Sequence, residues 1–208
     1  IASVQPKILS YQDKNSFEHA GAAGGYVDQL GYPFCRGRML NVTEQDMGQY
    51  NSDEKVFWTS GACMLVRKEA FDAVNGFDED FFAHMEEIDL CWRMQSLEYT
   101  CQFNHQSTVY HLGGGTLGMG SPFKVFLNFR NNLYMLAKNL PVFKLFWLLP
   151  LRLCLDIIAS IKFLLEGNFK IAWTVIKAHF SFYWNLFHTL KKRQRIKRVK
   201  GNYSLYPK

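Results

Sequence analysis

The 208-residue sequence has few cysteines and no composition typical of disordered or fibrous proteins. Its five cysteines form no Cys-x-x-Cys pair and no Cys/His cluster at zinc spacing, which argues against a disulfide framework and a structural zinc site. We therefore expect buried, reduced thiols in a cytosolic setting. Apolar residues make up 48% of the chain and charged residues 20%, a composition that excludes a wholly disordered or collagen-like protein.

Acidic residues are scarce in the last part of the chain. Residues 1–120 hold 8 Lys and Arg against 16 Asp and Glu, whereas residues 121–208 hold 16 against 2. The formal charges are therefore −8 and +14, and seven of the positive charges lie in residues 191–200. Such a split predicts contact with an anionic membrane surface; a solvated tail is the alternative, and no base-reading motif supports nucleic acid.

No apolar run is long enough for a clear membrane span. The best candidate, residues 145–161, contains Pro150, Arg152 and Asp156. A span needs about 20 mostly apolar residues, and each charge at the bilayer centre costs about 2.5–3.5 kcal/mol. Because aromatic residues and lysines alternate from residue 143 to residue 187, we expect helices that lie in the membrane interface. An ordinary packed helical subdomain is the alternative.

The pattern of apolar and turn-forming residues predicts an α/β part followed by a helical part. Strands are expected at residues 1–10, with Pro6 near an edge, at 57–66, at 99–103 and at 107–111. Residues 11–55, rich in Gly and Asn, are expected to form a long ordered loop region. Helices are expected at 68–74, 84–97, 121–139, 142–165 and 168–190.

A cluster of carboxylates stands at the start of the 84–97 helix. Glu86, Glu87 and Asp89 lie where negative charge favours the positive end of a helix, and Asp89 can pair with Arg93 one turn later. Crowding raises the pKa of at least one carboxylate in such a set, which suits a general base. On spacing alone, helix capping explains the cluster equally well.

Several motifs together resemble the second half of a family 2 glycosyltransferase, an enzyme with the GT-A fold. They are Trp58-Thr-Ser-Gly-Ala-Cys-Met-Leu-Val-Arg67, Gly76-Phe-Asp-Glu, Glu86-Glu-Ile-Asp-Leu-Cys-Trp-Arg93 and Val109-Tyr-His-Leu-Gly-Gly-Gly-Thr116. The segment with Asn128, Arg130 and Asn131 matches rhamnosyltransferase-like members. The resemblance implies an α/β fold in which residues 1–140 form the acceptor-side half of a GT-A domain. Residues 141–208 would follow as membrane-associating helices with a basic tail.

The resemblance also implies an activity. Such enzymes transfer a sugar with inversion from a nucleotide-sugar donor to a glycan or lipid-linked acceptor, and we expect this in cell-surface polysaccharide synthesis. Glu87 matches the general base, although the family has Asp there, and Glu86 would support Glu87 or hold the acceptor.

Other residues match sugar-facing or phosphate-facing positions of the family. Trp58, Gly61 and Ala62 would face the donor sugar and acceptor, with Asp89 and Arg93 as further candidates or as a structural pair. His111, Gly113 and Gly114 would approach the metal or the diphosphate. A core tryptophan, a loop-anchoring histidine and a plain glycine turn are the structural alternatives.

One family motif is absent from the sequence. No Asp-x-Asp fits the metal motif of the nucleotide-binding half, because Asp78-Glu-Asp80 lies in the later Gly-Phe-Asp-Glu turn. Since the chain begins at Ile1 and shows no signal peptide, we expect a piece of a longer enzyme, inactive alone. A divalent cation, Mg²⁺ or Mn²⁺, would then be held mostly by the missing half. We expect the enzyme at the cytoplasmic side of the cell membrane, as a peripheral or monotopic protein.

Two other functions stay open. The first is a non-catalytic adaptor that binds a membrane surface through its basic helices. The second is a metal-dependent hydrolase that would use the following residues: His84, Glu86, Glu87, Asp89 and His111. Metal-ligand spacing favours the hydrolase poorly, because adjacent glutamates point to different faces of a helix.

Overall fold

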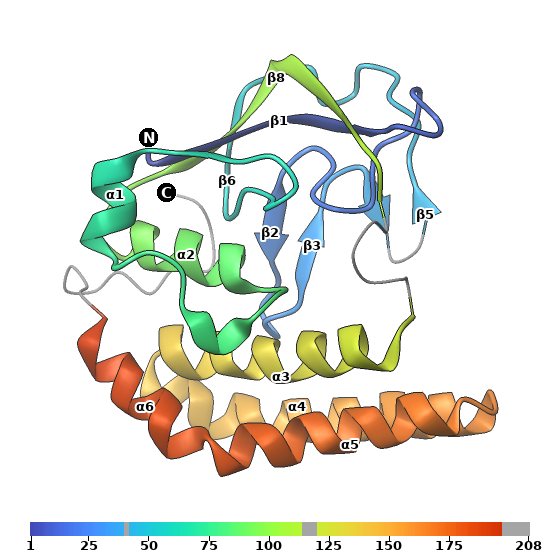
Figure 1. The fold of residues 1–208 in the computed structure, drawn as a ribbon, viewed down its shortest axis with the longest axis vertical. Helices are drawn as coiled ribbons and strands as arrows, with labels where there is room; N and C mark the ends of the chain where they lie inside the picture. The colour runs from blue at the N-terminus through green and yellow to red at the C-terminus, as the bar shows by residue number, and fades with distance from the viewer. Residues whose placement is uncertain (40–41, 114–119, 197–208) are drawn as a thin grey trace. The chain divides into compact units, whose positions relative to one another are not determined.

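The structure, a computed structural model, describes residues 1–39, 42–113 and 120–196, which form two compact units (Figure 1). The sheet unit contains residues 1–78 and the described residues from 87 onward to 113. The helical unit contains residues 79–86 and 120–196. Residues 79–86 therefore belong to the helical unit, although the residues before and after them belong to the sheet unit.

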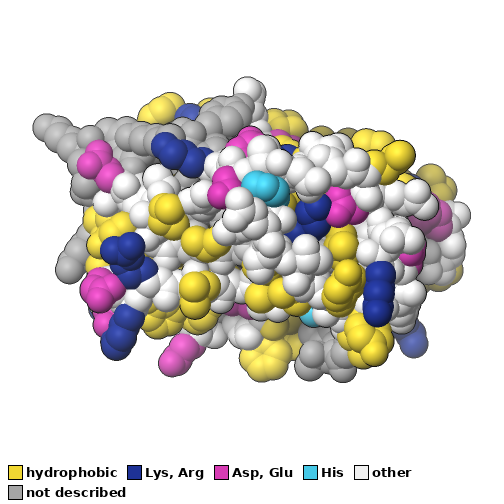
Figure 2. Space-filling model, turned by 90° about the horizontal axis from the view of Figure 1, so that it is seen from above, with side chains coloured by type: hydrophobic (Ala, Val, Ile, Leu, Met, Phe, Trp, Pro, Cys, Tyr) yellow, Lys and Arg dark blue, Asp and Glu magenta, His cyan; other side chains and the backbone are white. Residues whose placement is uncertain are grey.

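The main sheet has four strands in the order β6-β8-β1-β7. They are β1 (Ser3–Ser10), β6 (Glu54–Val56), β7 (Leu65–Val66) and β8 (Cys101–His111). β1 and β8 run parallel, and the other pairs are antiparallel, so the fold is mixed α/β. The register of β1 against β8 shifts at Pro6, where an amide N–H is missing from the ladder. Figure 2 shows acidic and basic side chains distributed among apolar ones on the face it displays.

A second sheet lies in the region expected to be loop. Its antiparallel strands are β2 (Gly25–Val27), β3 (Pro33–Cys35), β4 (Arg38–Met39) and β5 (Val42–Thr43). Gly31 and Gly37 take positive φ angles of 82° and 83° at the two turns that flank β3. The prediction of little regular structure was wrong here because strands of two or three residues are too short to show a period.

The strand predicted at residues 57–66 was also wrong in its extent. Only its end forms β7, and β6 precedes it. The amides of Phe57 and Trp58 both donate to the carbonyl of Gly25, at 2.8 and 3.1 Å. These two residues therefore do not pair with a strand of the main sheet. The two strands predicted at 99–111 are one strand, β8, paired along β1.

Two helices complete the sheet unit. α1 (Lys68–Ala73) ends before Asn75 and Gly76, which take φ angles of 61° and 64°, so the predicted stop signal is confirmed. α2 (Glu86–Gln95) carries the carboxylate cluster in its first turn. It is shorter than the predicted 84–97 helix because His84 and Met85 have positive φ angles.

The helical unit contains a short 3-10 helix and four α-helices. They are η1 (Glu79–Phe81), α3 (Pro122–Asn139), α4 (Val142–Leu165), α5 (Phe169–Trp184) and α6 (Leu186–Arg195). α3 starts as predicted, since the Ser121 hydroxyl accepts a hydrogen bond from the Lys124 amide at 3.2 Å. The predicted 168–190 helix is divided at Asn185. Residues 197–200 of the basic run lie outside the described residues.

The charges that interrupt the apolar run of α4 face inward. Arg152 and Asp156 are each only 1% exposed. Arg152 donates to the Asn132 side chain at 2.6 Å, and His179 of α5 lies 2.9 Å from Asp156. Polar side chains of α3, α4 and α5 thus meet in the interior of the helical unit. Within residues 1–39, 42–113 and 120–196, no helix combines the length and apolar character that a membrane crossing requires.

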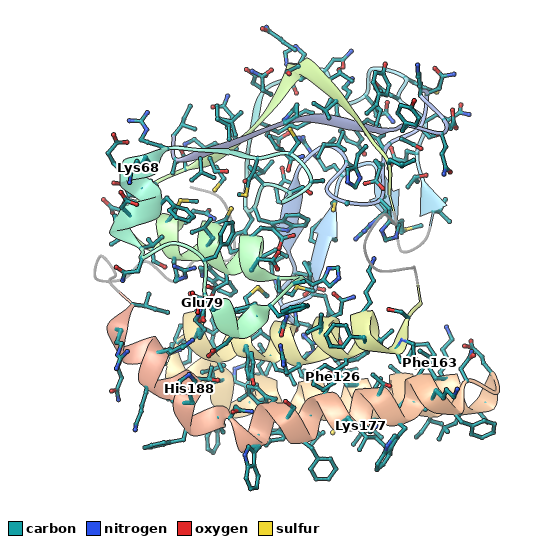
Figure 3. All side chains as sticks on the ribbon, in the orientation of Figure 1. Lys68, Glu79, Phe126, Phe163, Lys177 and His188 are labelled. Carbon is teal, nitrogen blue, oxygen red and sulfur yellow. The ribbon has the colours of Figure 1, made fainter. Side chains whose placement is uncertain are left out.

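The outward faces of α4 and α5 are apolar. Exposed side chains recur every three or four residues along each helix, the spacing of a single helix face. On α4 they include Phe143, Phe146, Trp147, Leu151, Ile158, Ile161 and Leu165, and on α5 Phe169, Trp173, Phe180 and Trp184. Figure 3 shows side chains that project from these helices, with Phe163 and Lys177 labelled.

The cysteines are all free thiols, as expected. Cys35, Cys91 and Cys101 are buried, whereas Cys63 is half-buried and Cys154 of α4 is exposed. The expectation of uniform burial was therefore wrong for Cys154, because its position falls on the outward face of α4.

Candidate active site

Glu87 lies at the first turn of α2, half-buried, beside a glycine of the sheet unit. A Cβ atom added at Gly61 would lie 4.0 Å from the Glu87 Cβ, an ordinary contact distance. The glycine itself is exposed, so solvent and small molecules reach the backbone next to this carboxylate. The start of a helix also favours the charged form of a carboxylate. Glu87 and Gly61, matched separately to family positions in the sequence, are thus neighbours within the sheet unit.

A second carboxylate of the sheet unit lies near the same place. Burial raises the pKa of the Cys35 thiol to about 11, Arg38 opposes this shift, and the charges of Glu87 and Glu18 add to it. Both carboxylates are therefore near enough to the Cys35 thiol at the end of β3 to act on it electrostatically. Sequence reasoning did not select Glu18.

Glu18 contacts the predicted phosphate-facing histidine. Its Oε2 lies 3.2 Å from Nδ1 of His111 at the end of β8. The pairing of β1 with β8 joins Ser10 to His111, and the Glu18 amide donates to Ile8 of β1 at 3.0 Å. A Cβ added at Gly113 would lie only 2.6 Å from Glu18 Oε1, so this glycine permits a close approach of the backbone. Gly114 lies outside the described residues.

The described side chains do not form a complete cation site. Among residues 1–39, 42–113 and 120–196, no group of three or more His, Cys, Asp and Glu side chains could hold a metal ion. His111 and Glu18 supply two ligand types that divalent cations accept, but two side chains alone do not complete a coordination shell. The hydrolase alternative also lacks its ligand set, since Asp89 is bound to Arg93.

Three of the residues matched to sugar-facing positions of the family have buried side chains. Trp58 is buried, and its indole donates to the Tyr26 carbonyl at 2.9 Å. Asp89 and Arg93 are buried and form an ion pair of 2.7 Å. Arg93 also donates to the carbonyl of Val74 at 2.6 Å, which ties α2 to the end of α1. These contacts fit the structural alternatives for Trp58, Asp89 and Arg93, and their role toward the sugar stays a prediction; Ala62 is half-buried beside Gly61.

The loop that leads into α2 has an unusual backbone. Phe82, His84 and Met85 have φ angles of 62°, 67° and 73°, although none of them is glycine. Each such residue costs about 1–3 kcal/mol and persists only where its surroundings hold it. The loop ends at Glu86, so the strain stands directly before the two candidate catalytic carboxylates.

Side chains of the helical unit hold this loop from several elements. Asn131 of α3 donates to the carbonyls of Phe81, Ala83 and His84, each at 2.8 Å. On α6, Nε2 of His188 lies 3.0 Å from the Asp80 carboxylate, and Lys192 pairs with the same group. Figure 3 labels Glu79, at the start of η1, and His188. In the sequence, Asn131 was noted only as part of the segment that resembles rhamnosyltransferases, without a role.

His84 has an electrostatic environment that disfavours its charged form. Burial lowers the pKa of the His84 imidazole, and the positive charge of Lys124 lowers it further. The neutral ring is therefore the dominant form near neutral pH.

Comparison with known proteins finds partial relatives. A 60-residue stretch is 40% identical to N-acetylglucosaminyl-diphospho-decaprenol L-rhamnosyltransferase of Mycobacterium tuberculosis (strain H37Rv), covering 29% of this chain and 20% of that protein. A 76-residue stretch is 44% identical to rhamnosyltransferase WbbL of Escherichia coli (strain K12), covering 35% of this chain and 29% of that protein. The chain thus spans less than a third of the length of these relatives, and no protein-family profile matches it.

Proposed function

We propose that this chain is part of a family 2 glycosyltransferase with the GT-A fold. It would transfer a sugar from a nucleotide-sugar donor to a glycan or lipid-linked acceptor in cell-surface polysaccharide synthesis. The observation that carries the proposal is the half-buried Glu87 beside the exposed Gly61, in a chain with partial homology to rhamnosyltransferases. Because the Mycobacterium tuberculosis relative is named for N-acetylglucosaminyl-diphospho-decaprenol and both relatives are named rhamnosyltransferases, a lipid-linked acceptor and a rhamnosyl donor are the first substrates to test.

Glu87 performs the proton transfer in this proposal. Its carboxylate accepts the proton of the acceptor hydroxyl while the hydroxyl oxygen forms a bond to the anomeric carbon of the donor sugar. The bond from that carbon to the diphosphate oxygen breaks at the opposite side, so the nucleoside diphosphate leaves and the configuration inverts. Glu86, one position earlier on α2, would orient the acceptor. A divalent cation, when bound, would neutralise the leaving diphosphate.

The described residues support only a partial role toward that cation. In this proposal His111 and Gly113 approach the diphosphate; the support is their match to the family motif and the Glu18 carboxylate 3.2 Å from the imidazole. Since the sequence lacks a fitting Asp-x-Asp, we propose that most cation ligands and the nucleotide pocket lie outside this chain. Calorimetry tests this: micromolar binding of a nucleoside-diphosphate-rhamnose to the isolated chain would contradict it.

Substitution of Glu87 by Gln tests the catalytic assignment in the complete gene product that contains this chain. General bases contribute about 10²–10⁴-fold to rate, so we expect kcat to fall at least about 100-fold with the fold intact. Transfer from nucleoside-diphosphate-rhamnose to N-acetylglucosaminyl-diphospho-lipid is the assay. Glu69→Gln is the matched control, because Glu69 is an exposed glutamate in the first turn of α1. Full activity of Glu87→Gln would refute the base assignment.

We also propose that the helical unit binds the cytoplasmic surface of the cell membrane. The outward apolar faces of α4 and α5 and their lysines match the chemistry of an interfacial protein. Phe146 and Trp184 are 87% and 90% exposed, and Nζ of Lys191 lies 4.5 Å from the centre of the Phe187 ring. Lysines placed over aromatic rings at such a face can reach anionic headgroups.

Vesicle co-sedimentation tests the membrane proposal. If half of each aromatic side chain enters the bilayer, replacing Phe146 and Trp184 by Gln costs about 2 kcal/mol, or about thirty-fold in partitioning. Met39→Gln with Leu65→Gln is the control, because these exposed apolar residues lie in the sheet unit. We expect binding to phosphatidylglycerol vesicles, weaker binding to phosphatidylcholine, and no effect of the control. Unchanged binding of the aromatic variant would refute the proposal.

A further inference from the structure

The strained loop before α2 depends on one buried amide. Asn131 is 0% exposed, and its Nδ2 group donates to three backbone carbonyls of the loop, those of Phe81, Ala83 and His84. Carbonyls that are removed from water need hydrogen-bond partners, and these three share the two N–H groups of one nitrogen. Asn131 therefore both satisfies the loop and sets the path of its backbone.

A second side chain fixes the orientation of that amide. The Arg130 Nε group donates to the Asn131 Oδ1 atom at 3.0 Å, so the oxygen faces Arg130 and the nitrogen faces the loop. Arg130 itself donates to the carbonyls of Asp80 and Phe81, at 3.1 and 3.4 Å. Arg130 and Asn131 of α3 thus bond to the carbonyls of four loop residues, all within the helical unit.

Only two residues separate the last loop carbonyl bound by Asn131 from the candidate base Glu87. His84, the last carbonyl held by Asn131, is followed by Met85, Glu86 and Glu87. Two of the residues after the clamp begin α2, whose hydrogen-bonded backbone transmits a shift at its first turn to both carboxylates. We propose that Asn131 is a positioning residue that sets the location of the Glu87 carboxylate. This inference rests on the proposed function of Glu87.

Substitution by Asp isolates the hydrogen bonds from the shape of the side chain. Asn131→Asp keeps the size but replaces the donor by an acceptor that repels the three carbonyls. In the complete gene product we expect kcat to fall about 10–100-fold, because a displacement of about 1 Å at a reacting group has that effect. The KM for nucleoside-diphosphate-rhamnose should stay within about twofold, since Asn131 acts through Glu87 and not on the donor.

Two further variants separate positioning from loss of folding. Leu133→Ala removes a buried side chain of α3 two residues away, and we expect lower stability with normal kcat. If Asn131→Asp does not fold, Arg130→Gln serves in its place, because Arg130 is half-buried and orients the amide. We then expect a smaller loss of kcat, about tenfold or less.

A double substitution tests the route of the effect. Because Asn131 acts through Glu87, Asn131→Asp in a Glu87→Gln background should lower the remaining activity by less than about threefold. Hydrogen exchange at the amides of residues 82–88 should be at least about tenfold faster in Asn131→Asp, without any substrate.

The outcomes distinguish the two proposals. If Glu87→Gln retains turnover, the base assignment fails, whatever the exchange data show about the loop. If Glu87→Gln is inactive but Asn131→Asp keeps normal kcat, or if the two losses multiply in the double variant, the positioning role of Asn131 is wrong. Unchanged hydrogen exchange in Asn131→Asp would also overturn it.

Discussion

Asp156 offers the strongest test of how the helical unit is stabilised. Its carboxylate lies 3.6 Å from Arg152 and 2.9 Å from His179, and it is 1% exposed. Arg152 is equally buried and also donates to Asn132 at 2.6 Å. Replacing Asp156 by Asn keeps the shape but removes the negative charge that faces the buried guanidinium.

The expected effect follows from desolvation. Breaking a buried ion pair by removing one partner costs about 3–5 kcal/mol, because the other charge stays in the interior without compensation. The same helix contains an exposed pair of equal spacing, Lys162 and Glu166, separated by 3.7 Å. Such surface pairs contribute about 0–1 kcal/mol, so Glu166→Gln is a matched control with a small expected effect.

Urea unfolding followed by circular dichroism at the helix band measures both variants. We expect a clear loss of unfolding free energy for Asp156→Asn and little for Glu166→Gln, with similar slopes against urea. Replacing Arg152 by Met together with Asp156 by Leu should recover part of the loss, because both charges then leave the interior. Equal losses for the Asp156 and Glu166 variants would refute the reasoning.

Three further predictions follow from single groups. Because burial lowers the pKa of His84 below the 6.5 of an unfolded chain, the folded state binds fewer protons, so stability should fall as pH falls below about 6.5. The unfolding free energy of His84→Gln, measured by urea unfolding, should therefore fall less in acid than that of the natural protein, and the two should change equally with pH above 7. An identical pH dependence of the two free energies over the whole range would contradict this. Maleimide at pH 8 should label exposed Cys154 quickly and Cys35 slowly, since the Cys35 pKa is raised to about 11; mass spectrometry after timed quenching measures this, and equal rates would contradict it. Gly25→Ala should cost about 1–3 kcal/mol in thermal unfolding, since its Cβ would lie 2.0 Å from the Trp58 ring, whereas Gly61→Ala should cost little.

Several features were predictable because they depend on neighbours in sequence. The start of α3 at Ser121-Pro122, the stop at Asn75-Gly76 and the bounds of α4 each rest on caps or a helical period. The placement of Glu87 in the first turn of a helix follows from the same local rules.

Other features were wrong or invisible because they depend on residues far apart. The amides of Phe57 and Trp58 bond to Gly25, which removes them from the strand that their composition favours. Glu18 and His111 meet only because β1 pairs with β8. Trp58, Asp89 and Arg93 match family motifs, and only the tertiary structure shows that their side chains are buried.

The apolar run of α4 shows most clearly which features depend on the sequence alone and which depend on tertiary packing. By itself the sequence determined a helix at 142–165 with a proline and, in its middle, Arg152 and Asp156, and it determined the excess of positive charge that follows. It did not determine which way the charges point. Only packing against α3 and α5 turned Arg152 and Asp156 inward and left an apolar face outward, because buried charges need partners that other helices supply.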